Sequence, residues 1–302
     1  MFSSIEKILL LILVLFIVAA VIIAAATRSG NSTPSSPAEL WRLYYSELLI
    51  VAAVIIPAYL GGIYFLLAIL VFNLRSHIEI AQIHGKQFSD PVILSSLITT
   101  TVVLCISAIS GNTPWLVISV QLATVGLFSV ILAIMLKQRL TRYIPSLLLI
   151  CLIILSLSAL IVIGNMPNGL ILIIFLFVIS ETNDAFALVF GKIMGKHRIL
   201  SKISPNKTLE GLACGILISA VAGYLYNQFI LDYPPAAAIP LILIIILSVI
   251  TGDIIFSVYK RYFKVKDFKE VISNQGGVLD IYDSLLVSSL IFYIILACKH
   301  GL

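Results

Sequence analysis

The stretch GLILIIFLFVISETNDAFALVFG, which spans residues 169–191, decides the fold class of this protein. Its apolar part is long and continuous, and about 20 such residues let an α-helix cross the hydrocarbon core of a bilayer. A membrane β-strand would instead alternate apolar and polar residues over about 10 positions. The stretch therefore predicts a transmembrane helix.

Eight further apolar runs accompany this one, and the charged fraction of the chain is too low for a water-soluble domain. Hydrophobic residues make up 61% of the chain and charged residues 11%, against about 25% charged residues in soluble domains. We therefore expect an all-α, polytopic integral membrane protein with about nine transmembrane helices. The nine runs span residues 8–26, 48–72, 91–110, 115–136, 147–164, 169–191, 209–231, 239–259 and 284–298.

The first run has two readings. Lys7 precedes it and small residues follow at positions 24–26, as in a cleaved signal peptide. Its roughly 19 apolar residues exceed the 7–15 of a signal-peptide core, which favours a retained helix.

Lysine and arginine predict the orientation of the chain in the membrane. With the N-terminus inside and nine alternating spans, the inside segments hold 16 of the 19 basic residues, and Arg28, Arg42 and Lys299 stay outside. This positive-inside bias predicts a cytoplasmic N-terminus and an outside C-terminus. The net charge of +5 is spread over loops, which argues against a nucleic-acid partner.

The polar residues divide the chain into two regions. Residues 1–146 form N-terminal transmembrane helices with few polar residues in their apolar runs. Residues 147–302 carry acids and bases near loops 192–208 and 260–283, and we expect these loops to face the cytoplasm. An acid within a spanning helix costs about 2.5–3.5 kcal/mol on insertion scales, so it needs a functional reason. The four cysteines form no CxxC pair, so no zinc site or disulfide framework is indicated.

The first polar group is Ser180-Glu181-Thr182-Asn183-Asp184, near the end of the run at 169–191. It suggests a hydrated pocket or a cation site, with a simple position at the membrane interface as the alternative.

The second group is the loop GKIMGKHRILSKISPNKTLEG, residues 191–211. Its glycines do not have the GxxxxGK[ST] spacing of a P-loop. Ser204 followed by proline predicts a helix N-cap, and a helix N-terminus facing the cytoplasm can bind phosphate, with Lys207 placed to help. The alternative is an ordinary basic cytoplasmic loop.

The third group begins at the end of the run at 239–259. On a helix, Asp253, Ser257 and Lys260 or Arg261 fall on one face because their spacings are four and seven or eight residues. Such carboxylates beside cations suit a hydrated divalent metal ion together with an anionic ligand.

The same group continues after a short polar segment. Asp280 and Asp283 are three residues apart and share a face of the next helical start. The pair Gly276-Gly277 gives the backbone freedom for close approach to a phosphate. A salt-bridged cytoplasmic loop is the alternative for the whole stretch 252–284.

This stretch resembles the signature of the phosphatidate cytidylyltransferases (CDP-diacylglycerol synthases), GDxxxSxxKRxxxxKD followed by HGGxxDRxD. The matching residues are Gly252, Asp253, Ser257, Lys260, Arg261, Lys266, Asp267, Gly276, Gly277, Asp280 and Asp283. Residues 183–191 resemble the segment NDxxAYxxG of that family, and residues 204–211 resemble its SPxKTxEG. The resemblance covers about the last 130 residues.

Three positions depart from the family pattern. Gln275 replaces the histidine of HGG, Ile281 replaces the arginine of DRxD, and Leu188 replaces the tyrosine of NDxxAY. Two readings therefore stay open beside the family's reaction: an enzyme that uses another lipid acceptor, and a non-catalytic relative that binds lipid or nucleotide.

The resemblance implies that CTP and phosphatidic acid give CDP-diacylglycerol and pyrophosphate, with Mg²⁺ as cofactor. It implies CTP, phosphatidic acid or another lipid phosphate, and the lipid bilayer as partners, and leaves the oligomeric state open, a homodimer included. The implied metal ligands are Asp253, Asp280 and Asp283, with Asp184 as a further candidate. Lys207, Lys260, Arg261 and Lys266 would hold phosphates, and Ser204, Ser257 and the Gly276-Gly277 backbone would orient them. Asp253, Asp280, Asp283, Lys260 and Arg261 are thus the expected catalytic residues.

Overall fold

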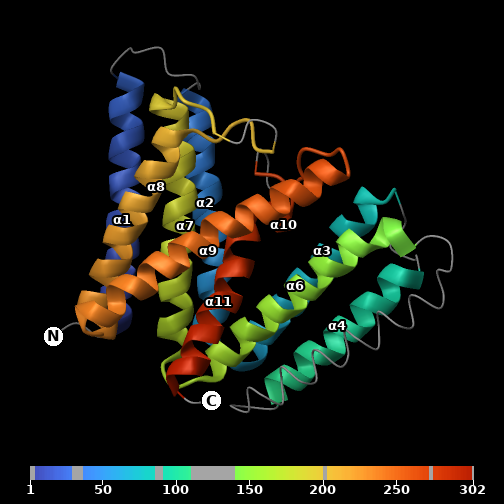
Figure 1. The fold of residues 1–302 in the computed structure, drawn as a ribbon. Helices are drawn as coiled ribbons and strands as arrows, with labels where there is room; N and C mark the ends of the chain where they lie inside the picture. The colour runs from blue at the N-terminus through green and yellow to red at the C-terminus, as the bar shows by residue number, and fades with distance from the viewer. Residues whose placement is uncertain are drawn as a thin grey trace.

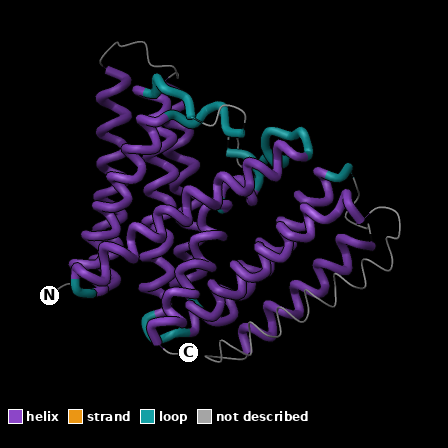
Figure 2. Tube along the Cα trace, in the orientation of Figure 1, coloured by secondary structure: helices purple, strands orange, loops and turns teal. Residues whose placement is uncertain are grey.

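The protein is a bundle of α-helices in the computed structural model, which describes residues 4–28, 37–85, 91–109, 140–199, 203–271 and 275–300 (Figure 1). No β-strand occurs in these ranges (Figure 2). The elements are α1 (Ser4–Arg28), α2 (Pro37–Leu60), α3 (Gly62–Ile83), α4 (Pro91–Ile109), α6 (Leu140–Asn165), α7 (Gly169–Met194), α8 (Leu209–Tyr226), the π-helical turn η1 (Asn227–Leu231), α9 (Pro235–Tyr262), α10 (Val278–Ile281) and α11 (Asp283–His300).

Seven helices of the described part are long and apolar enough to cross a membrane, namely α1, α2, α3, α6, α7, α8 with its following turn, and α9. The segments Ile93–Ile109 and Asp283–Cys298 form shorter apolar helices. The prediction of a polytopic, all-α membrane protein is confirmed. The predicted run at 115–136 lies outside the described residues.

The prediction of one span at 48–72 is wrong, because the segment belongs to two helices. Gly61, with φ 63°, separates α2 from α3. Each helix extends beyond the apolar run into polar residues that the protein buries. On α3, for example, Asn73 is fully buried and donates from Nδ2 to the hydroxyl of Thr100 (2.8 Å).

The additional helix determines at which end of the bundle the chain begins. Lys7 on α1 donates from Nζ to the carbonyl of Phe229 in η1 (3.0 Å), whereas residues 203–208 lie at the opposite end of α8. Figure 1 shows the start of α1 and the end of α11 at the same end of the bundle, away from the loops before α8 and after α9. The start of α1 and the end of α11 therefore lie at the end of the described bundle away from these loops, and the side of the membrane that each terminus faces stays a prediction.

Arg28 and Arg42 lie on the side of the loops in this arrangement, because α1 ends and α2 begins there. The bias of lysine and arginine towards the loops is thus kept. The cytoplasmic position of loops 192–208 and 260–283 stays a prediction.

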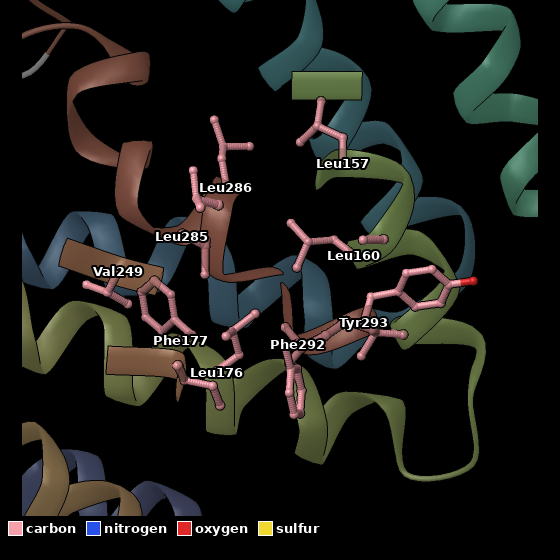
Figure 3. Close-up of a cluster of buried hydrophobic side chains, with 14 of the residues drawn as sticks. Leu157, Leu160, Leu176, Phe177, Val249, Leu285, Leu286, Phe292 and Tyr293 are labelled. Atoms are coloured by element: carbon pink, nitrogen blue, oxygen red, sulfur yellow. The ribbon is translucent and has the colours of Figure 1, made fainter. Parts of the chain in front are cut away.

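The buried core joins the helices that carry the polar groups. Helix α11 packs against α9, α6 and α7, and α7 packs along α8. Figure 3 shows leucines of α6, Phe177 of α7 and Val249 of α9 around Leu285, Leu286 and Phe292 of α11. Burial of these side chains holds the first turn of α11 beside α9 and α7, where the site is found.

Candidate active site

A close approach of α9 and α11 brings two of the predicted acids together. A Cβ atom on Gly252 would lie 2.8 Å from the carbonyl oxygen of Asp283 and 3.0 Å from Cα of Ser284. Glycine is thus the residue that lets the first turn of α11 lie against α9. Asp253 follows Gly252 directly, and the carboxylates of Asp253 and Asp283 interact electrostatically.

Asp184 joins this pair from α7. The hydroxyl of Ser284 lies 3.2 Å from Oδ1 of Asp283 and is also in hydrogen-bonding reach of Asp184. The Asp184 carboxylate interacts electrostatically with Asp253 and Asp283. The structure therefore gathers three of the four predicted metal ligands from three helices.

Two lysines provide the opposite charge. Lys207 forms an ion pair with Oδ2 of Asp253, whose Oδ1 accepts a hydrogen bond from Ser257 (3.2 Å). Lys260 lies close enough to Asp253 and Asp283 to interact with both, and its Nζ is 2.6 Å from Oδ1 of Asp280. Ser257, Lys207 and Lys260 are thus where the sequence predicted them, beside the acids.

Mg²⁺ prefers carboxylate and other oxygen ligands, which these acids offer, and the binding of the ion here stays a prediction. Oδ1 of Asn183, beside Asp184, is buried and has no hydrogen-bond partner among the described residues. As they stand, no three acidic, histidine or cysteine side chains in the described ranges are close enough to share a metal ion. Instead, the ammonium group of Lys207 forms an ion pair with the carboxylate of Asp253.

Asp280 lies beside the cluster of Asp184, Asp253 and Asp283, and both of its carboxylate oxygens have partners. Besides Lys260, it accepts hydrogen bonds at Oδ2 from the backbone N–H of Phe268 (2.7 Å) and of Gly277 (2.9 Å). Gly276 has φ 85°, and a Cβ there would meet the Asp280 side chain. In this arrangement Asp280 and the two glycines shape the turn before α10, and their predicted contacts with metal and phosphate stay a prediction.

The predicted helix start at Ser204 is wrong. Helix α8 begins at Leu209 and is capped by Thr208, whose Oγ1 accepts from the N–H of Gly211 (3.2 Å). Ser204 instead accepts at its carbonyl from the N–H of Lys207 (3.3 Å), which closes a turn. Thr208 wins because its extended backbone and hydroxyl satisfy a free amide of the first helical turn.

Two predicted phosphate ligands lie elsewhere. Arg261 donates from its guanidinium to the carbonyls of Ile203 and Val265 (2.9 Å each), so it joins the two loops. Lys266 is exposed, and its Nζ is 3.9 Å from the carboxylate of Asp267. Their contact with a phosphate is untested by this arrangement.

An apolar groove between α1, α2 and α7 lies beside the site. Its walls include Ile12, Phe16, Ile23, Val51, Ile55, Phe177 and Phe186, and the acids among the described residues that line it are Glu47 and Glu181. Glu181 is three residues before Asp184 on α7. Residues of α7 on both sides of Asp184 line the groove, which therefore passes beside the turn of α7 that carries this acid.

The structure also shows two acids whose roles the sequence reasoning did not assign. The Glu210 carboxylate accepts from the N–H of Lys196 (3.1 Å) and contacts Nδ1 of His197 (2.6 Å), which fastens the loop before α8. Glu79 on α3 accepts from two amides of α10. The cost of an acid in a spanning helix is the signal that would have singled out Glu79.

The fold and the site together define a polytopic membrane protein with a carboxylate and lysine centre at one end of its helices. The chain belongs to the cytidylyltransferase family, which it matches over residues 42–299. The predicted family is thereby confirmed.

Curated relatives match a shorter part of the chain. It is 39% identical over 121 residues to the phosphatidate cytidylyltransferase of Staphylococcus saprophyticus and 38% identical over 121 residues to that of Staphylococcus aureus. It is 33% identical over 129 residues to the uncharacterized protein YnbB of Escherichia coli. These matches cover 39% of this chain and 46% of each phosphatidate cytidylyltransferase, and 43% of both chains for YnbB. The matched segment thus spans about half the length of these relatives.

Proposed function

We propose that this protein transfers the cytidylyl group of CTP to phosphatidic acid, giving CDP-diacylglycerol and pyrophosphate. The observation that carries the proposal is the convergence of Asp184, Asp253 and Asp283 with Lys207 and Lys260 beside an apolar groove. The names of the staphylococcal relatives support the choice of phosphatidic acid as acceptor.

The reaction is a substitution at the α-phosphorus of CTP. A phosphate oxygen of phosphatidic acid forms a bond to this phosphorus, while the bond to the oxygen that bridges to the β-phosphate breaks. The electron pair of the broken bond leaves with pyrophosphate. Because the lipid phosphate is ionised near neutral pH, the site needs no strong general base, and its task is to position the reactants and neutralise charge.

The chain offers a residue for each part of this task. Lys207 and Lys260, now paired with Asp253 and Asp280, would bind the phosphates of the two substrates. Ser257 keeps Asp253 oriented through its hydrogen bond. Asp184, Asp253 and Asp283 would hold Mg²⁺, which when bound supplies positive charge against the triphosphate.

The apolar groove accounts for a lipid acceptor. Its apolar walls lie on helices that span the membrane, so an acyl chain would exchange one apolar environment for another. Because the groove passes beside the turn of α7 that carries Asp184, a chain lying in it would bring its phosphate towards the lysines.

One assay tests the proposal. Purified protein in lipid nanodiscs receives CTP and Mg²⁺ with phosphatidic acid, with a different lipid phosphate or with diacylglycerol, and pyrophosphate release and cytidine-labelled lipid are measured. We expect turnover with phosphatidic acid. Turnover with a different acceptor alone would show a retuned enzyme, and CTP binding without pyrophosphate release from any acceptor would show a non-catalytic relative.

A further inference from the structure

We propose that Glu79, on α3, is a positioning residue that holds the first turn of α10 and thereby sets the places of Asp280 and Asp283. The anchoring role stands on the contacts of Glu79 alone, whereas its consequence for turnover rests on the proposed function.

The Glu79 carboxylate binds the start of α10 with both oxygens. Its side chain is fully buried, and Oε1 accepts from the N–H of Val278 (2.8 Å) while Oε2 accepts from the N–H of Leu279 (2.9 Å). Amides in the first turn of a helix have no partner within the helix. A carboxylate at this end satisfies them with charge-assisted hydrogen bonds.

Arg75 extends this attachment to the loop before α10. Its Nε is 3.0 Å from Oε1 of Glu79, and its guanidinium also donates to the carbonyl of Lys269 (3.2 Å). The Arg75 and Glu79 pair, one turn apart on α3, therefore fastens the loop at Lys269 and at the start of α10.

Gly277 permits the approach of this carboxylate. A Cβ atom at this position would lie 2.6 Å from Oε2 of Glu79 and 2.5 Å from Cβ of Phe268. The second glycine of the Gly276-Gly277 pair is thus explained by a contact with α3, because any side chain would displace Glu79.

The position of α10 bears directly on the site. Asp280, the third residue of α10, holds Lys260, and α11 begins at Asp283, two residues after α10 ends. A shift of α10 would therefore move a lysine and an acid of the proposed metal centre together. Glu79 itself has no contact with the cluster of Asp184, Asp253 and Asp283 among the interactions of the described residues, which makes it a positioning residue.

Glu79→Gln tests the proposal. The amide keeps a single acceptor oxygen and turns an NH₂ group towards a backbone N–H, so the start of α10 should loosen. Glu270→Gln is the matched control, because Glu270 is an exposed acid on the neighbouring loop and loses the same charge. Glu79→Asp keeps the charge on a shorter side chain and should therefore retain part of the attachment of α10.

The first readout is the Mg²⁺ concentration that gives half-maximal turnover of the folded enzyme. We expect a rise of about tenfold in Glu79→Gln, equivalent to about 1.4 kcal/mol, and no change in Glu270→Gln. A purely structural role would lower the yield of folded protein and leave this concentration unchanged.

The second readout is hydrogen exchange of the Val278 and Leu279 amides in nanodiscs, which does not require activity. We expect faster exchange in Glu79→Gln than in Glu270→Gln. If the wild type is inactive, the proposed function fails, and the hydrogen exchange of the two amides alone tests the role of Glu79. Exchange rates in Glu79→Gln equal to those in Glu270→Gln would then overturn that role. If the wild type is active and the Mg²⁺ dependence of Glu79→Gln is unchanged, the positioning role is overturned and the proposed function stands.

Discussion

The Nζ atom of Lys260 lies 2.6 Å from Oδ1 of Asp280, and the two side chains are 10% and 7% exposed. This buried ion pair joins the last turn of α9 to α10. Because the other oxygen of Asp280 accepts the N–H groups of Phe268 and Gly277, the same carboxylate orders the loop between the two helices. Lys260 also lies over the ring of Phe268, 5.9 Å from its centroid.

Removing one partner of this pair should destabilise the protein. We expect Lys260→Met or Asp280→Asn alone to lower the free energy of unfolding by roughly 3–5 kcal/mol, because the remaining buried group loses the charged partner that it contacts directly. The double variant should lose less than the sum of the two. Unfolding in mixed detergent micelles measures this.

The exposed pair of Lys266 and Asp267 provides the control for that cycle. Their side chains are 64% and 51% exposed, and such pairs contribute about 0–1 kcal/mol. Two outcomes would contradict the role assigned to Lys260 and Asp280. The double variant could lose as much free energy of unfolding as the two single variants together, or each single variant could lose as little as Lys266→Met.

Asp283→Asn should abolish turnover and leave the fold intact. Asp283 is 5% exposed, and its Oδ1 accepts a hydrogen bond from the N–H of Ser284 (2.6 Å). The amide oxygen of asparagine can still accept this hydrogen bond. The loss of the charge should remove a metal ligand, and we expect a larger effect than the roughly 10–100-fold loss that outer-shell changes give. Rates at limiting Mg²⁺ measure it, with the exposed Asp267→Asn as control. A near-normal rate in Asp283→Asn would show that Asp283 does not bind the metal.

The start of α1 and the loops around the site should face opposite sides of the membrane. In a background without Cys105, Cys151, Cys214 and Cys298, single cysteines replace Glu6, Lys196 or Lys264. An impermeant thiol reagent should label the cysteine at position 6 in intact cells. The other two should react only after the cells are permeabilised.

The intact mass of the purified protein is needed beside this labelling, since it shows whether the first helix is retained. Equal labelling of all three cysteines in a protein of full mass would contradict the arrangement of α1, α2 and α3. Labelling at 196 and 264 in intact cells would reverse the predicted orientation of the site.

Gln275→His together with Ile281→Arg should raise turnover with phosphatidic acid. Nε2 of Gln275 donates to the hydroxyl of Ser46 (2.8 Å) and to Oε1 of Glu47 (3.1 Å), and histidine can keep one of these bonds while it gains the ability to carry charge. Arginine at 281 would add a planar, charged donor for phosphate.

We expect a gain of about tenfold from the pair of changes, which requires only about 1.4 kcal/mol of transition-state stabilisation. Each single variant should gain less, and Gln275→Met, which removes the donor without adding an imidazole, should gain nothing. An unchanged or lower rate with phosphatidic acid in the double variant would favour an enzyme retuned for another acceptor.

The sequence determined the helical class and most of the polar cluster, because both depend on local spacing. Continuous apolar runs long enough to cross a bilayer predict helices wherever they occur. The helical repeat places Asp253 and Ser257 on one face, and the structure joins them by a hydrogen bond of 3.2 Å. The family resemblance was also readable without coordinates, and its segments at residues 183–191 and 204–211 added Asp184 and Lys207 to the cluster.

Tertiary structure alone decided the features that depend on partners distant in sequence. Hydropathy merged α2 and α3 because it treats Asn73 and Glu79 as unfavourable in a membrane. Inside the protein, Asn73 donates to Thr100, and Glu79 accepts from the amides of α10. The acceptor carboxylate of Glu79 and the donor amide of Val278 are 199 positions apart, so no local pattern joins them. The end of the bundle at which α1 begins follows from the same cause, because the division of residues 48–72 between α2 and α3 adds one helix between α1 and the site.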